Sequence, residues 1–139
     1  MLNLVTQIDE NAISRLLSVY SESMNEMKIH FANDAEMCGA YASFLRDFVK
    51  NPKQLILVEA TDDEWVSALR AIETIEGHWF LEAVETKPEE RKKGFGKDLL
   101  DHTIDYLKNI GMRELTCTIS KNNFKSQALH GKCGFIPTN

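Results

Sequence analysis

The sequence has no long apolar run and few cysteines, and these absences exclude several classes of protein. No apolar stretch approaches the ~18 residues that a membrane-spanning helix needs, so we expect no membrane span. Residues 1–5 contain neither a basic segment nor a long apolar segment, so we expect no secretion signal. Cys38, Cys117 and Cys133 are odd in number and lack metal-ligand spacing, which predicts reduced thiols in a cytoplasmic protein.

The sequence also lacks internal repeats, low-complexity segments and linkers, so we expect a single domain over residues 1–139. The hydrophobic fraction of 43% is sufficient for a core. The formal net charge of −5 argues against a general nucleic-acid-binding protein. The basic residues between positions 91 and 97 are therefore a local patch on an acidic chain, which favours a small anionic ligand.

Apolar spacing predicts helices and strands in the order β-α-α-β-β-β-α-β-α. Asp9 is the expected cap of one helix that carries its apolar residues on a single face as far as Met27. Asn33 or Asp34 is expected to cap the second helix, which ends before Pro52. The remaining predicted elements are strands at residues 54–60, 65–74 and 78–86, a helix from residue 94 to 111, a strand at 114–120 and a helix from residue 122 or 123.

The segment from residue 85 to 100 indicates a phosphate site. Pro88 ends the preceding strand because it cannot donate to a ladder, and Gly94 and Gly96 allow a backbone to approach a ligand closely. The following helix start offers unpaired N–H groups and a partial positive charge. The spacing differs from the P-loop, and Leu99 stands where a dinucleotide loop needs a small residue.

Arg91-x-x-Gly94-x-Gly96 resembles the acetyl-coenzyme A signature of the GCN5-related N-acetyltransferase (GNAT) family. Residues 123–135 resemble the C-terminal motif of that family, Asn-x-x-Ala-x-x-Leu-Tyr-x-Lys-x-Gly-Phe. The specific resemblance covers residues 79–135, and the first half matches only in element order. It implies an α/β (α+β) fold with a mixed central sheet, helices on both faces, and C-terminal strands that are here short or missing.

The resemblance also implies acetyl-CoA as co-substrate, without a metal, in a notch between strands 78–86 and 114–120. The pantetheine would pair with the backbone around Val84 and Thr86. Asn123 would bond the cofactor arm, unless it only caps its helix. The pyrophosphate would lie on the loop and helix start that contain Arg91, Lys92, Lys93, Gly94, Phe95, Gly96 and Lys97.

The implied reaction is direct attack by a primary amine, from a small molecule or a protein, on the acetyl group. Strand alternation predicts that Phe80, Glu82, Val84 and Thr86 share one face, and Glu82 is the first candidate base. Glu85 is a weaker candidate, and a water chain to either carboxylate is an alternative. Acidic residues near the expected acceptor entrance favour a cationic amine: Glu22, Glu26, Asp34 and Glu36.

His130 occupies the position of the family's tyrosine acid. It could donate a proton to the departing thiolate, or it could fill the tyrosine's place while water donates. Cys117 raises a rival route through an acetyl-cysteine. However, Leu115, Cys117 and Ile119 share one strand face, which indicates core. Tyr20 and Tyr41 could belong to the core or to the substrate wall.

The sequence after Phe135 is too short for the strands that usually follow in the family. The strand at 114–120 would then be an edge, which a partner subunit could cover, and we expect a homodimer. The altered tyrosine position and short end also support an alternative, a non-catalytic acyl-CoA-binding or regulatory module. A third interpretation is a phosphate-binding domain unrelated to coenzyme A.

Overall fold

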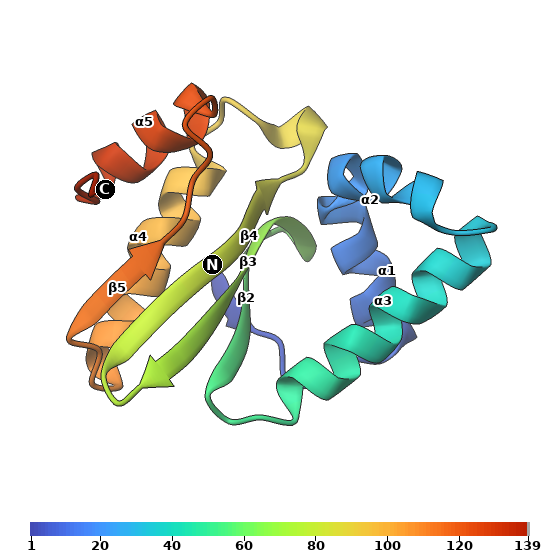
Figure 1. Cartoon of the computed structure of the whole chain (residues 1–139), viewed down its shortest axis with the longest axis horizontal. Helices are drawn as coiled ribbons and strands as arrows, with labels where there is room; N and C mark the ends of the chain where they lie inside the picture. The colour runs from blue at the N-terminus through green and yellow to red at the C-terminus, as the bar shows by residue number, and fades with distance from the viewer. Residues whose placement is uncertain (139) are drawn as a thin grey trace.

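The computed structural model describes residues 1–138 as a five-stranded sheet with helices on both faces (Figure 1). The strands are β1 (Leu2–Leu4), β2 (Gln54–Thr61), β3 (Glu64–Ile75), β4 (His78–Thr86) and β5 (Glu114–Cys117), and they neighbour one another in that order. All pairs are antiparallel except β4 with β5, which is parallel. The predicted mixed sheet is therefore confirmed.

Three helices cover one face of the sheet: α1 (Glu10–Val19), α2 (Ser21–Met27) and α3 (Asp34–Val49). The opposite face carries α4 (Phe95–Asn109), and α5 (Phe124–Lys132) lies beside it (Figure 1). Short 3-10 turns at Lys28–His30 and Pro88–Glu90 join these elements. The predicted element order is confirmed, apart from a division of the first helix.

Strand alternation gives the sheet two cores. Ile56 and Val58 of β2 pack in the cluster under α1 and α3, whereas Leu57 packs in the cluster under α4. Leu16 and Leu99, one from each cluster, are fully buried. The period of two along β2 therefore places its side chains alternately on the two faces.

The single helix predicted over residues 10–27 is wrong, because the chain turns at Tyr20. Tyr20 ends α1 with φ −91° and ψ 21°, and α2 starts at the next residue. Its hydroxyl donates a hydrogen bond of 2.7 Å to the carbonyl oxygen of Ala83 in β4. The predicted apolar face divides at this point, since Leu16 lies in the core while Met24 and Met27 line a cavity.

The predicted strand at 114–120 is too long. β5 ends at Cys117, and its ladder with β4 extends only from His78 opposite Glu114 to Leu81 opposite Cys117. Beyond Leu81 the ladder stops, next to a bulge in β4. Among residues 1–138 no strand pairs with the outer edge of β5, so the expected homodimer stays a prediction.

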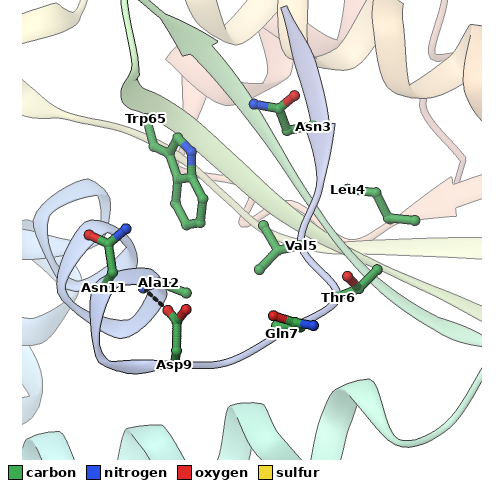
Figure 2. A pocket seen from close by; sticks show the side chains of 9 residues that line it. All are labelled: Asn3, Leu4, Val5, Thr6, Gln7, Asp9, Asn11, Ala12 and Trp65. Carbon is green, nitrogen blue, oxygen red and sulfur yellow. Dashed lines mark hydrogen bonds between the residues drawn. The ribbon is translucent and has the colours of Figure 1, made fainter.

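Asp9 caps α1 as predicted, in a small hollow of about 200 Å³ beside Trp65 (Figure 2). Its carboxylate accepts a hydrogen bond of 2.8 Å from the backbone N–H of Ala12. Asp9→Ala should lower the free energy of unfolding by about 1 kcal/mol, because it leaves that N–H without its cap. Urea denaturation measures the change, and the exposed Ser14→Ala is the control. Equal stability of the two variants would refute the capping role.

Candidate active site

A bulge in β4 determines which side chains of this strand face the candidate site. Ala83 has a positive φ of 55°. Ala68 of β3 faces Glu85, but Arg70 faces Glu82, so β4 holds one residue more than β3 in this interval. A bulge of this kind bends a strand and re-aims its side chains. Left-handed backbone costs a non-glycine residue about 1 kcal/mol or more, and the hydrogen bond from Tyr20 helps to hold it.

The bulge overturns the predicted facing of Glu82. Ala83 packs in the cluster under α1 and α3, and Val84 packs in the cluster under α4. Glu82 accepts bonds from Arg70, whose guanidinium lies 4.9 Å from the ring centre of Phe44 in α3. Glu82 therefore lies on the α3 side, away from Val84, because the extra residue interrupts the period of two.

The notch predicted between β4 and β5 is present. β5 pairs with β4 only through Leu81, so Glu82–Thr86 has no partner strand on that side among residues 1–138. An extended ligand can bind such an edge as an additional half-strand. Val84 and Thr86, the predicted pantetheine contacts, both belong to this free edge.

The loop after β4 forms an anion cradle. Lys92 and Gly94 adopt positive φ values of 66° and 87°, and Gly94 precedes the first turn of α4. Within residues 1–138 the backbone N–H groups of residues 92–97 donate to no acceptor. Unpaired N–H groups at a helix start, with the helix dipole behind them, favour a bound anion.

The basic side chains of this loop are mostly neutralised by carboxylates. Arg91 pairs with Glu22 at 2.8 Å and also donates to the carbonyl oxygen of Thr86. The Arg91 guanidinium holds the pKa of Glu22 below its ordinary value. The other pairs are Lys93 with Glu90 at 3.0 Å and Lys97 with Asp101 at 2.6 Å. The backbone N–H groups, more than free side-chain charge, therefore define the cradle.

Gly96 and Asn123 join the cradle to α5. A Cβ on Gly96 would lie 3.2 Å from Leu129 Cδ2 and 3.4 Å from Thr86 Oγ1, so the glycine permits close packing of α4 against α5 and β4. Asn123 Oδ1 accepts a bond of 3.1 Å from the N–H of Ser126 and so caps α5. Its role toward a cofactor stays a prediction.

A cavity of about 380 Å³ lies on the other side of β4, under α2 and α3, whose residues line it. Ala83 and Glu85 line it from β4, and Glu85 accepts a hydrogen bond from the hydroxyl of Ser23. Arg70 lines it too, but its Nε and Nη2 bind Glu82 at 3.0 and 2.7 Å. Tyr41 also lines the cavity. Burial raises the pKa of its hydroxyl to about 12, so the hydroxyl stays neutral.

His130 is buried at the end of α5, edge-on to Phe135 with ring centres 5.1 Å apart. Its Nδ1 lies 2.8 Å from the carbonyl oxygen of Ser126. A carbonyl oxygen only accepts hydrogen bonds, so Nδ1 carries the proton and the neutral ring has none on Nε2. A neutral His130 has therefore already used its single N–H.

Cys117 lies on the inner face of β5, in the cluster under α4, as predicted for a structural residue. Burial raises the pKa of its thiol, which disfavours the nucleophilic thiolate. Cys117→Ala should therefore keep turnover within about threefold, as expected for a residue outside the covalent chemistry. Steady-state thiol release measures this, with Cys38→Ala as control. A loss of several orders of magnitude would instead support an acetyl-cysteine route.

A model of the Acetyltransferase (GNAT) family matches residues 15–135. The chain belongs to this family. It is 28% identical over 90 residues to an uncharacterized N-acetyltransferase, YobR, of Bacillus subtilis, a match that covers 65% of the chain and 36% of YobR. The chain thus spans about a third of the length of this curated relative.

Solved structures share this GNAT fold over the whole chain. A transcriptional regulator from Bacillus halodurans has a TM-score of 0.80 at 14% identity, and 95% of it is covered. The aminoglycoside N-acetyltransferase AAC(6')-Iy in complex with CoA has a TM-score of 0.71 at 16% identity, and 93% of it is covered. At these identities the likeness establishes the fold. No helix within residues 1–138 is both long enough and apolar enough to cross a membrane.

In this GNAT fold the predicted loop residues directly follow the free edge of β4, whereas the side chain of Glu82 points to the α3 side and pairs with Arg70. Sequence reasoning missed Ser23 and Arg70. Ser23 belongs to no motif, and its contact with Glu85 joins residues 62 positions apart. The sequence did carry a signal for Arg70, which is a cation inside the apolar run of β3. In the structure only 15% of its side chain is exposed.

Proposed function

We propose that the chain transfers the acetyl group of acetyl-CoA to a primary amine by direct attack. The observation that carries this proposal is the placement of two sites on one short segment. Glu82–Thr86 borders the free notch, while Ala83 and Glu85 of the same segment line the cavity under α2 and α3. A thioester in the notch and an amine in the cavity would therefore meet across the bulge.

The cradle and the free edge support acetyl-CoA as the donor. The pyrophosphate would accept bonds from the N–H groups of residues 92–97, and the pantetheine would pair with the backbone of Val84 and Thr86. Within residues 1–138 the N–H groups of residues 92–97 have no acceptor, and no strand pairs with the notch side of Val84 and Thr86. Asn123 retains an amide NH₂ without an acceptor within residues 1–138, which it could offer to the cofactor arm.

Glu85 is the better placed base of the two predicted carboxylates. Glu82 gives one oxygen to two donors of Arg70, which neutralises its charge. Glu85 is bound only by the hydroxyl and N–H of Ser23, both neutral donors, and it faces the cavity. Its negative charge would attract an ammonium and receive the proton that the nitrogen loses during attack.

His130 can protonate the departing thiolate only as an imidazolium, because Ser126 already accepts its Nδ1 proton. Water is the other candidate donor. His130→Phe distinguishes them, since a lower turnover with unchanged acetyl-CoA affinity would support His130. Unchanged turnover would assign the proton to water.

Two measurements test the proposal against the alternatives. Thermal-shift titration with acetyl-CoA should raise the melting temperature, whereas no stabilisation at high ligand would contradict any acyl-CoA site. Thiol release should then increase when amines are added. Tight binding with no amine-dependent release would support the non-catalytic module, the candidate that the occupied Nδ1 of His130 favours.

A further inference from the structure

The cavity under α2 and α3 has an apolar wall of unusual composition for a site expected to receive a cation. Three methionines and two phenylalanines line it: Met24, Met27, Met37, Phe31 and Phe44. Two of them, Met27 and Phe44, are exposed large hydrophobic residues at 42% and 44% of their surface. Methionine side chains are flexible and polarisable, so such a wall adapts to an apolar guest.

The cavity carries one carboxylate that no cation neutralises among residues 1–138, that of Glu85. Arg70 is paired with Glu82, so the two cancel. Glu85 has no cationic partner among residues 1–138 and bonds only to Ser23. Glu85 lines the cavity and belongs to the segment Glu82–Thr86, which borders the notch. The cavity therefore offers a place for one ammonium, and a second cation would meet apolar side chains.

Three buried polar side-chain atoms lack a hydrogen-bond partner among residues 1–138, and one of them belongs to a residue that lines the cavity. The hydroxyl oxygen of Tyr41 is inaccessible to solvent and has no hydrogen-bond partner among residues 1–138. Tyr41 belongs to α3 and lines the cavity together with the apolar wall. Buried hydroxyls are almost always paired in native proteins, so this one points to a hydrogen-bonding atom on the guest.

From the wall, the single carboxylate and the unpaired hydroxyl, we infer that the acceptor is a small apolar monoamine. It has one ammonium for Glu85, an aromatic or branched aliphatic body for the methionine wall, and one hydrogen-bonding group for Tyr41. The same features disfavour polycationic acceptors, because a further charge placed against the apolar wall would be desolvated without a partner. The inference rests on the proposed function and specifies its acceptor.

The first test compares amines that differ in one property each. 2-Phenylethylamine is an apolar monoamine, tyramine adds one hydroxyl, spermidine is a polycation, and a short peptide supplies a free amino terminus. The value of kcat/KM for 2-phenylethylamine should exceed that for spermidine by at least about tenfold, from burial of the ring. A preference for spermidine or for the peptide would overturn the inference.

A binding measurement separates failure of this inference from failure of the proposed function. The amines are titrated calorimetrically into the protein saturated with CoA, where no acetyl transfer can occur. If 2-phenylethylamine binds more tightly than spermidine but is not acetylated, the preference of the cavity for an apolar monoamine stands and the proposed function fails. If amines are acetylated but the polycation binds and reacts better, the proposed function stands and the acceptor class fails.

Two matched variants test the wall directly. Met27→Glu and Asn25→Glu add the same charge to exposed positions of α2, but only Met27 lines the cavity. Met27→Glu should lower the ratio of kcat/KM for 2-phenylethylamine to that for spermidine by about tenfold or more. Asn25→Glu should change it by less than about twofold. Equal effects would overturn the assignment of the cavity.

Tyr41→Phe tests the hydroxyl. The native protein should prefer tyramine over 2-phenylethylamine by about two- to tenfold, the worth of one hydrogen bond. The variant should lose this preference, because phenylalanine has no hydroxyl to bond the hydroxyl of tyramine. An unchanged tyramine preference in the variant would overturn the assigned contact.

Discussion

Replacing Glu85 with glutamine is expected to lower kcat/KM for an amine by about 100-fold, the lower range for loss of a general base. The amide keeps the shape of the side chain and can still accept the bond from Ser23, so the cavity should stay intact. The charge that attracts the ammonium and the proton acceptor are lost together. Acetyl-CoA affinity should be unchanged, because the cradle lies at residues 92–97 and does not contact this carboxylate.

Glu82→Gln is the matched comparison for this prediction. It makes the same chemical change three residues away, on a carboxylate that Arg70 already neutralises. We expect a loss in kcat/KM below about tenfold, since an indirect effect through Arg70 is smaller than loss of the base. Initial rates at saturating acetyl-CoA measure both variants. The reverse ranking would restore Glu82 as the base and remove Glu85.

Gly96→Val is expected to weaken acetyl-CoA binding by about 10- to 100-fold, because overpacking costs about 1–3 kcal/mol at this position. The new Cβ would lie 3.2 Å from Leu129 Cδ2, and the two methyl groups of valine would extend further. Displacement of the first turn of α4 would move the N–H groups that form the cradle. Gly96→Ala should be milder, since the end of Leu129 can shift by a few tenths of an ångström.

Gly39→Ala is the control for a glycine replacement in a helix. Gly39 lies in α3, and a Cβ there would meet no atom within 4 Å. This change should raise the free energy of unfolding by about 0.5–1 kcal/mol and leave acetyl-CoA affinity unchanged. Calorimetric titration below the melting temperature of each variant measures binding of the folded protein. Native affinity in Gly96→Val would refute the role of this close contact.

Local rules predicted the elements well where neighbours in sequence decide the structure. Asp9 and Asn33 cap their helices by accepting bonds from backbone N–H groups three residues later, a fixed spacing that the sequence shows directly. β4 has the predicted limits of His78 and Thr86, since Gly77 precedes the strand and Pro88 follows it. The first helix could not be predicted, because it breaks where Tyr20 reaches a carbonyl 63 positions away.

By itself the sequence determined the features of the proposed donor side: the order of elements, Gly94 and Gly96 at the start of α4 and the cap of α5. These features depend on backbone conformation and on contacts between close neighbours, which each residue type restricts directly. Only the tertiary structure decided the features of the proposed acceptor side. One extra residue at Ala83 interrupts the alternation of side chains along β4. As a result Glu82 pairs with Arg70, and Glu85 lines the cavity. The bulge could not be predicted from the sequence of β4 alone, because it is defined by the register in which β4 pairs with β3.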